Sequence, residues 1–199
     1  DDERAAWFVS ANVVQRSYKD EVLAKIDALR ATFDVVQYGA LPLDPGRYPL
    51  FYVKTRGMDA SKPTVLLTGG VHGYETSGVQ GALQFLKEEA LKYSDRFNFV
   101  VFPCVAPWGY ECIQRWNPGC ADPNRGFVAD SPVAECAAVM AAVAALGVHQ
   151  WAMHLDLHET TNSDDYEFRP AKASCDGVEL GAPGVPDGFY LIGNKLRPA

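Results

Sequence analysis

The sequence predicts a single α/β domain over residues 1–199, a three-layer sandwich with a mostly parallel sheet between two layers of helices. Two observations predict this fold. Apolar runs typical of buried strands alternate with stretches of helical length that are amphipathic or rich in alanine. Hydrophobic residues make up 48% and charged residues 22% of the chain, which is typical of an ordered protein with a substantial core.

The elements follow one another in this alternation. Apolar residues at three- and four-residue steps predict the helices, and continuous apolar runs bounded by proline or glycine predict the strands. In chain order they are a helix at 18–33, strands at 34–38, 50–55 and 64–68, a helix at 76–93, a strand at 97–105, a helix at 131–147 and a strand at 150–157. Ser131 is the expected N-cap of the last helix, and Gly147 is its expected end. After Glu167 the clustered glycine and proline residues predict a loop.

Charge and composition argue against several classes of protein. The formal net charge of -7, with 18 Lys and Arg and no basic run, disfavours nucleic-acid and anionic-membrane partners. The most apolar stretch, 136–148, is too short for a bilayer span of about 20 residues. No leader peptide is visible, and the 5 cysteines lack CxxC spacing. We therefore expect a cytoplasmic protein with no nucleic-acid or membrane partner.

Histidine and carboxylate side chains stand where two predicted strands end. His72 and Glu75 follow one apolar run, and His158 closes another. Ligands of such sheets bind beyond the carboxyl ends of the strands. Two histidines and one glutamate leave a coordination position open for water, which is the donor set of a catalytic zinc site. Two alternatives stay open: a structural histidine beside a helix-capping glutamate, and a structural zinc site with a fourth protein ligand.

Three further residues near His158 have weaker claims to the metal. His154 shares a strand face with Asp156 and His158 at period two, but its position deeper in the strand favours a core histidine. Asp156 is better suited to hydrogen-bond and orient a ligand than to act as one. His149 is expected to be an ordinary loop residue.

A segment dense in Trp, Asn, Pro and Gly lies between the two strand ends and is predicted to be an irregular loop. It carries Arg115, Asn124 and Arg125. The planar guanidinium of Arg125 suits a carboxylate, and Asn124 adds an amide donor beside it. Arg115 could stabilise the oxyanion that forms when water adds to a carbonyl. Taken alone, such arginines could equally pair with surface acids.

The order of these elements resembles that of the zinc metallocarboxypeptidases of the carboxypeptidase A type. His-x-x-Glu comes first, Arg115-Trp-Asn-Pro-Gly-Cys-Ala-Asp-Pro-Asn124-Arg125 comes second, and Asp-Leu-His ending at His158 comes third. The resemblance covers about residues 64–168. The continuation to Glu-Phe-Arg-Pro is closer to the uncharacterised carboxypeptidase-like members of the succinylglutamate desuccinylase and aspartoacylase branch.

This resemblance implies a mixed sheet of the zinc-carboxypeptidase kind and one zinc ion held by the two histidines and the glutamate. It implies that Asn124 and Arg125 grip the carboxylate of the substrate and that Arg115 polarises the scissile carbonyl. It also implies a general base, a glutamate many tens of residues beyond His158 and therefore past Ala199. We accordingly expect the C-terminal part of the family domain to be missing from this chain.

Three glutamates within the chain are alternative candidates for the base. Glu159 directly follows His158 and would point to the opposite face if the strand continued, while Glu167 and Glu179 cannot be placed. The expected reaction is cleavage of an amide bond next to a free carboxylate, which removes the C-terminal residue of a peptide. A deacylase of N-acyl amino acids would share the metal and the clamp. A catalytically inactive module that binds zinc and carboxylates is the third hypothesis.

Overall fold

The computed structural model describes residues 2–162, 164–182, 184 and 188–193. The chain forms two compact units, residues 1–159 and residues 160–199, and each is described by itself. The second unit contains a π-helical turn, Asp164–Phe168, that leads into α6 (Arg169–Asp176). This helix lies within the region after Glu167 that was predicted to be a loop, so that prediction is wrong for residues 169–176. The helix ends at Gly177, whose φ of 65° suits glycine.

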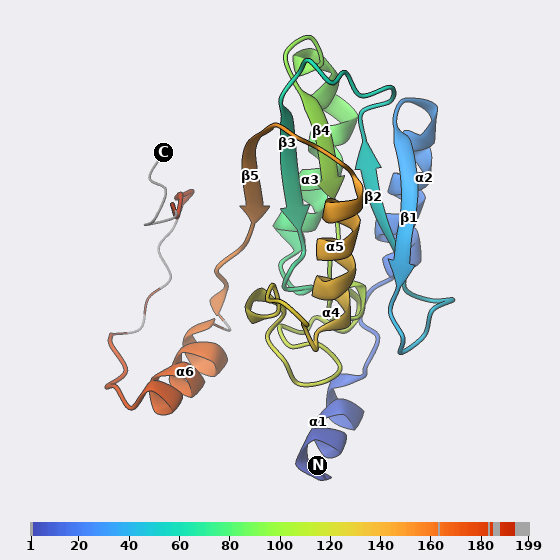
Figure 1. The fold of residues 1–199 in the computed structure, drawn as a ribbon. Coiled ribbons are helices and arrows are strands. Elements are labelled where there is room, and N and C mark those ends of the chain that lie inside the picture. Colours follow the sequence, from blue (N-terminus) through green and yellow to red (C-terminus); the bar gives the residue numbers. More distant parts are fainter. Residues whose placement is uncertain (1, 163, 183, 185–187, 194–199) are drawn as a thin grey trace. The chain divides into compact units, whose positions relative to one another are not determined.

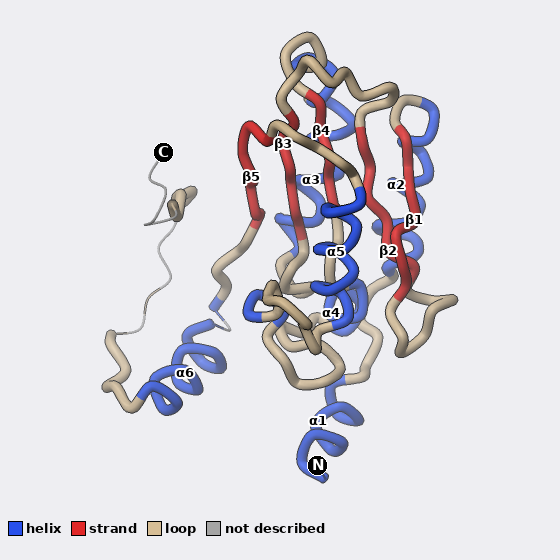
Figure 2. The backbone as a smooth tube through the Cα atoms, in the orientation of Figure 1, coloured by secondary structure: helices blue, strands red, loops and turns tan. Residues whose placement is uncertain are grey.

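The first unit contains the whole sheet (Figures 1 and 2). Its elements in chain order are α1 (Asp2–Ala11), a π-helical turn (Lys19–Leu23), α2 (Ala24–Ala28), a 3-10 turn (Leu29–Ala31), β1 (Asp34–Ala40), β2 (Pro49–Lys54), β3 (Thr64–Gly69), α3 (Thr76–Glu88), a 3-10 turn (Ala90–Tyr93), β4 (Asn98–Phe102), α4 (Pro107–Cys112), a 3-10 turn (Pro123–Arg125), α5 (Ala134–Ala145) and β5 (Trp151–Leu157). None of the helices in the described part of the chain combines the length and the apolar character that crossing a bilayer requires.

The sheet is mixed, and its strand order is β1-β2-β4-β3-β5. β1 and β2 pair antiparallel, as do β2 and β4, whereas β3 pairs parallel with both β4 and β5. Thr68 of β3 is in register with Phe102 of β4 and with Asp156 of β5. The carboxyl ends of these three strands therefore lie at one edge of the sheet, which is where the sequence predicted a site.

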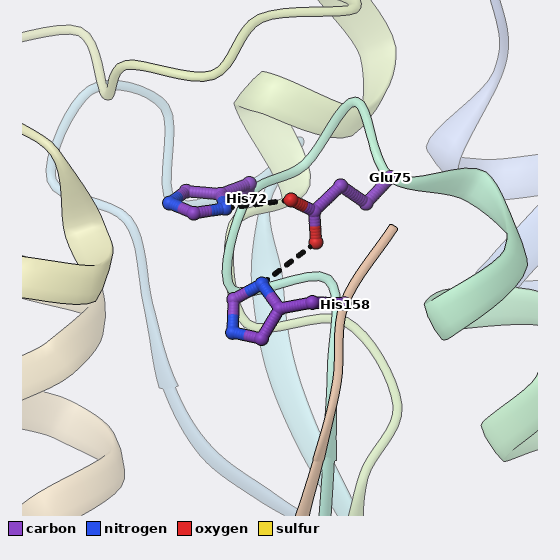
Figure 3. Close-up of side chains that lie close together, drawn as sticks. All are labelled: His72, Glu75 and His158. Atoms are coloured by element: carbon purple, nitrogen blue, oxygen red, sulfur yellow. Dashed lines mark hydrogen bonds and ion pairs between the residues drawn. The ribbon is translucent and has the colours of Figure 1, made fainter. Parts of the chain in front are cut away.

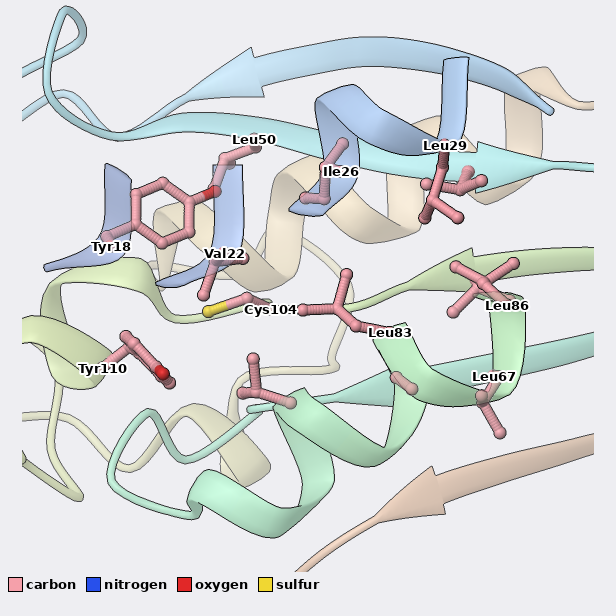
Figure 4. Packing of buried hydrophobic residues seen from close by; sticks show 14 of the residues in the cluster. Tyr18, Val22, Ile26, Leu29, Leu50, Leu67, Leu83, Leu86, Cys104 and Tyr110 are labelled. Atoms are coloured by element: carbon pink, nitrogen blue, oxygen red, sulfur yellow. The ribbon is translucent and has the colours of Figure 1, made fainter. Parts of the chain in front are cut away.

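Helices cover both faces of the sheet, so the predicted three-layer α/β/α architecture is confirmed. In Figure 1, α2 and α3 lie behind the sheet and α5 lies in front of it. Behind the sheet, buried apolar side chains of the helical segments pack in one cluster with those of the strands (Figure 4). Among them are Val22 of the first π-helical turn, Ile26 of α2, Leu83 and Leu86 of α3, and Leu67 of β3. In front of it, a smaller cluster comprises Val71, Val100, Phe102, Val105 and Val139. Each such side chain contributes about 1.5–3 kcal/mol when fully buried.

Several boundaries differ from the sequence predictions for local reasons. Helix α5 begins at Ala134 after an N-cap at Val133. The predicted N-cap at Ser131 is wrong. The hydroxyl of Ser131 instead donates to the carbonyl of Gly126 and accepts from the N–H of Val133. The strand predicted at 97–105 is shorter, since β4 ends at Phe102, before Pro103. Neither α1 nor α4 was predicted.

Candidate metal centre

A tight turn after β3 brings the first two candidate ligands to the edge of the sheet. Gly70 has a φ of 61°, and a Cβ at this position would lie 2.5 Å from Cγ2 of Val79, so glycine is required there. The N–H of Ala106 donates to the carbonyl of Gly70 at 2.9 Å, which fixes the turn against the segment after β4. His72 follows this turn, and α3 begins immediately after Glu75.

Glu75 occupies the N-cap position of α3, yet its side chain makes no capping hydrogen bond. Its carboxylate instead lies between two imidazoles (Figure 3), with Oε1 2.7 Å from Nδ1 of His72 and Oε2 2.8 Å from Nδ1 of His158. This geometry is not that of a helix-capping glutamate beside an unrelated histidine. That alternative from the sequence is therefore wrong.

The three side chains converge closely enough to hold one metal ion. Each offers a ligand atom, and these atoms lie within 4.8 Å of one another. The ring centroids of His72 and His158 are 5.0 Å apart. His72 and Glu75 are each only 2% exposed, so solvent competes little for their ligand atoms. Within the described residues this cluster contains no cysteine.

Asp122 holds the outer nitrogen of His72. Its Oδ1 lies 2.8 Å from Nε2 of His72, and its Oδ2 accepts from Arg115 at 3.2 Å. Carboxylates in this position fix the orientation of a metal-binding imidazole and raise its basicity. The sequence analysis gave Asp122 no role. The available signal was its place before Pro123 at the start of a turn, where its side chain accepts from the backbone N–H of Asn124 at 2.9 Å.

Asp156 holds the outer nitrogen of His158, as the sequence predicted. Its Oδ2 lies 2.7 Å from Nε2 of His158, and its Oδ1 accepts from the hydroxyl of Thr68 at 2.7 Å. Because the one hydroxyl proton of Thr68 goes to Asp156, the hydroxyl oxygen accepts from Nε2 of His154 at 2.9 Å. His154 is exposed on the edge strand β5. The prediction that it is a core histidine is therefore wrong.

The charges of the centre favour a bound cation. Burial opposes ionisation of Glu75, but hydrogen bonds with His158 and His72 lower its pKa. Burial likewise opposes the cationic form of His158, but hydrogen bonds with Asp156 and Glu75 raise its pKa to about 10. Burial also opposes the cationic form of His72, but hydrogen bonds with Asp122 and Glu75 raise its pKa. The acidic surroundings of both imidazoles thus favour positive charge, which a bound dication would supply, so the donor set and its surroundings fit zinc.

The loop predicted to carry the substrate clamp is irregular, as expected, and Arg115 lies beside the centre. The Arg115 guanidinium also lies 3.4 Å from the hydroxyl of Tyr74. In the sequence, Tyr74 stands between the candidate ligands His72 and Glu75. Asn124 and Arg125 belong to the 3-10 turn that directly follows Asp122, and Arg125 is exposed. Arg115 thus lies beside the centre because its guanidinium donates to Asp122. Asn124 contacts Asp122 as well, through its backbone N–H.

The alternative candidates for the general base are not confirmed. Oε2 of Glu159 accepts from the N–H and the hydroxyl of Ser77, at 3.0 and 2.9 Å, and so satisfies a backbone donor in the first turn of α3. The side chain of Glu167 lies outside the described residues, and Glu179 belongs to the second unit. The prediction of a base beyond Ala199 stays a prediction.

A sequence-family model described as zinc carboxypeptidase matches residues 48–173. The chain belongs to the zinc carboxypeptidase family. Zinc is therefore the metal of the family, in agreement with the predicted cofactor, and the cluster of His72, Glu75 and His158 could hold one ion. A search of curated proteins gives no significant match.

Solved structures of metallopeptidases share the fold of this chain. A candidate metallopeptidase from Shewanella baltica is 24% identical, covers 70% of this chain and 53% of its own, and has a TM-score of 0.58. A metallo-carboxypeptidase from Burkholderia cenocepacia is 23% identical over 72% of this chain and 42% of its own, with a TM-score of 0.58. Carboxypeptidase A from Helicoverpa armigera is 18% identical over 76% and 47%, with a TM-score of 0.57. The chain thus spans about half the length of these structures.

Proposed function

We propose that this chain carries the metal centre of a zinc-dependent hydrolase that cleaves the amide bond next to a free carboxylate and releases the C-terminal residue of a peptide. The arrangement of Glu75 is the observation that carries the proposal. A buried carboxylate at a helix N-cap would ordinarily accept from the helix N–H groups. Here it is hydrogen-bonded to His72 and His158 instead, and this convergence supports a role of the three side chains as metal ligands.

In the proposed mechanism His72, Glu75 and His158 hold the zinc ion. Zinc bound there lowers the pKa of a water molecule towards about 7 and polarises a carbonyl. Asp122 and Asp156 hold the outer nitrogens of the two imidazoles, so that Nδ1 of both rings stays on the side of Glu75, where a metal ion would be held. These contacts preorganise the centre before substrate binds, which reduces the cost of assembling it.

The positive groups of the loop supply the contacts to the substrate. Arg115 is held beside the centre by Asp122, and its guanidinium would stabilise negative charge developing on the carbonyl oxygen. Arg125 and Asn124 would bind the terminal carboxylate, the first as a bidentate partner and the second as an amide donor. The exposure of Arg125 is compatible with this role, because a clamp for a free substrate must be reachable from solvent.

The general base is proposed to be a glutamate beyond Ala199. Within the described residues, Glu75, Asp122 and Asp156 contact the two imidazoles and Glu159 directly follows His158, and each of these carboxylates is already hydrogen-bonded. A base has to come within about 3 Å of the proton that it abstracts, or reach it through one water molecule. A carboxylate that already orients an imidazole or caps a helix would have to give up that contact to act as the base.

Zinc content and turnover test the proposal together, on the longest natural form of the protein. We expect one zinc ion per chain and hydrolysis of blocked dipeptides with a free C-terminal carboxylate. Glu75→Gln should abolish turnover and weaken zinc binding by more than the roughly 10–100-fold that loss of an outer partner costs. Glu159→Gln is the matched control, since this glutamate directly follows His158 but accepts from Ser77 in the first turn of α3, so zinc content should be retained.

The substrate panel separates the proposed function from its rivals. It should contain N-acylated amino acids alongside the blocked dipeptides, because both classes carry the carboxylate that Arg125 would bind. Turnover of acylated amino acids alone would show a deacylase. Stoichiometric zinc and carboxylate binding without turnover of either class would show a binding module.

A further inference from the structure

Arg16 lies in the N-terminal arm, the segment 12–18 between α1 and the first π-helical turn. Its side chain contacts residues of the turn between the proposed ligands His72 and Glu75 and the start of α3. The guanidinium of Arg16 donates to the carbonyl of Gly73 at 3.0 Å, and it also donates to the hydroxyl of Thr76. Its Nε donates to the carbonyl of Tyr110 in α4 at 2.5 Å, and its Cζ lies 3.8 Å from the centroid of the Tyr110 ring. One side chain thus links α4 to both ends of the segment 73–76, which contains Glu75 and directly follows His72.

The arm itself is fixed to the end of α4. The N–H groups of Gln15 and Arg16 donate to the carbonyl of Glu111, at 2.9 and 3.2 Å. The N–H of Tyr18 donates to the side chain of the same Glu111 at 2.9 Å. Because the backbone of Arg16 is anchored on both sides, its guanidinium approaches the segment 73–76 from a defined position.

The segment 73–76, called the metal segment below, packs closely against the same helix, α4. A Cβ at Gly73 would lie 2.1 Å from the N of Tyr110 and 2.2 Å from the carbonyl carbon of Gly109. The backbone of the segment therefore contacts the backbone of α4 directly. Within the segment, the backbone bond from Glu75 N–H to His72 carbonyl, at 3.1 Å, closes the turn. The hydrogen bonds of Arg16 with Gly73, Thr76 and Tyr110 join this turn to α4 a second time.

We propose that Arg16 is a positioning residue for the metal centre. It holds the backbone of 73–76 on α4 and so sets the separation of His72 and Glu75 before metal binds. The inference rests on the proposed function, because it takes these two residues as ligands. A planar guanidinium can donate to three acceptors at once, whereas a lysine ammonium is a point charge on a flexible chain. Lysine should therefore replace Arg16 only in part.

Zinc affinity, measured by competition with a chelator on the full chain, tests this role. Arg16→Met should raise the zinc dissociation constant by about 10-fold or more, in the range seen when outer partners of metal ligands are lost. Arg16→Lys should give a smaller increase. The absorption spectrum of Co²⁺ bound in place of zinc should change in Arg16→Met, because it reports the geometry of the ligands.

Arg47→Met is the matched control. Arg47 donates to Oε2 of the same Glu111 at 2.7 Å but belongs to the loop before β2. Both substitutions remove an arginine from one network, so both should lower the melting temperature of the metal-free protein. Only the change at Arg16 should alter zinc affinity and the Co²⁺ spectrum.

The outcomes distinguish this inference from the proposed function. If the wild-type chain binds one zinc ion and Arg16→Met binds it with unchanged affinity and spectrum, the positioning role is overturned and the hydrolase proposal stands. If the wild-type chain binds no zinc, both are overturned. If Arg16→Met does not fold, the decision passes to Arg16→Lys, whose affinity should still fall below that of Arg47→Met.

Discussion

The two histidines of the centre have the same hydrogen-bonding pattern, but they differ in how deeply they are buried and in the contacts that hold them in place. Each directs Nδ1 to Glu75 and Nε2 to an aspartate, Asp122 for His72 and Asp156 for His158. The side chain of His72 is 3% exposed, whereas that of His158 is 31% exposed at the end of the edge strand β5. The same donor chemistry is therefore preorganised by packing on one side and by side-chain hydrogen bonds on the other.

The supports of the two sides differ in what a substitution would disturb. His72 lies in a segment enclosed by the backbone of α4 and by Arg16. His158 depends on the hydrogen bond of its Nε2 with Asp156, which in turn accepts from the hydroxyl of Thr68. We expect changes on the buried side to affect folding and metal binding together. Changes on the exposed side should affect mainly metal binding.

Gly73→Ala should have the largest effect, because it disturbs the close packing of the segment next to His72 against α4. The added Cβ would overlap backbone atoms of Tyr110 and Gly109, which cannot rotate away as a side chain can. Overpacking typically costs about 1–3 kcal/mol and occasionally more, and we expect the upper end of that range together with loss of zinc binding. Urea unfolding and metal analysis measure the two effects.

Gly81→Ala is the control for that substitution. Gly81 lies within α3, and a Cβ there meets nothing within 4 Å. Because alanine is the better helix former, this variant should be more stable by up to about 1 kcal/mol with unchanged zinc affinity. Equal behaviour of the two variants would refute the claim that the metal segment is held by close packing.

Replacing each of the two aspartates by asparagine tests the comparison of the two histidines directly. Asp122→Asn and Asp156→Asn should both weaken zinc binding within the roughly 10–100-fold range of outer partners. The loss should be greater at Asp122, because Asp122 is also the acceptor for the charged Arg115 at 3.2 Å, whereas Asp156 accepts from the neutral hydroxyl of Thr68. Chelator competition ranks the two variants. A greater loss at Asp156 would mean that the exposed side controls the affinity.

The sequence predicted the layers of the fold and the convergence of His72, Glu75 and His158, but not the strand order or the antiparallel pairing of β1 with β2 and of β2 with β4. The successful predictions follow from simple rules. Buried strands have continuous apolar runs, and their carboxyl ends lie at one edge of the sheet. The rules failed where tertiary contacts decide. Ser131 has the chemistry of an N-cap, but its hydroxyl is bound to Gly126. His154 lies in a strand whose neighbours indicated burial, but β5 is the edge of the described sheet.

The supports of the centre could not be predicted from the sequence because they join distant segments. The bond between His72 and Asp122 spans 50 positions, and that between Arg16 and Gly73 spans 57. No periodicity connects such residues. Glu159 shows the same limit. Strand alternation would apply to it only if the strand continued, but β5 ends at Leu157, and no sequence pattern predicted its hydrogen bond with Ser77 in the first turn of α3.

The dependence of stability on pH should differ with and without metal. Burial lowers the pKa of His158, but hydrogen bonds with Asp156 and Glu75 outweigh it and raise that pKa to about 10, above the ordinary value of 6.5. In the metal-free protein, the contribution of His158 is fully present below pH 6.5 and is lost as the pH rises through about 10. Unfolding by urea, measured after chelation at several pH values, should show this decline.

Asp122 should act at the opposite end of the pH range. Burial raises its pKa, but the hydrogen bond with His72 and the charge of Arg115 lower it to about 2, from an ordinary value of 3.8. Its contribution is present above pH 3.8 and is lost as the pH falls through about 2. His158→Gln should therefore remove the alkaline decline and leave the acid decline intact. Loss of both declines in this variant would mean that the two sides titrate as one unit.

Bound zinc should reverse the alkaline trend. Metal binding requires Nδ1 of both imidazoles to be free of protons, so zinc affinity rises with pH over the range in which His158 loses its proton. The stabilisation by a fixed concentration of zinc should therefore grow as the stability of the metal-free protein declines. Zinc stabilisation that stays constant from neutral to alkaline pH would contradict the proposal that His158 exchanges its proton for the metal.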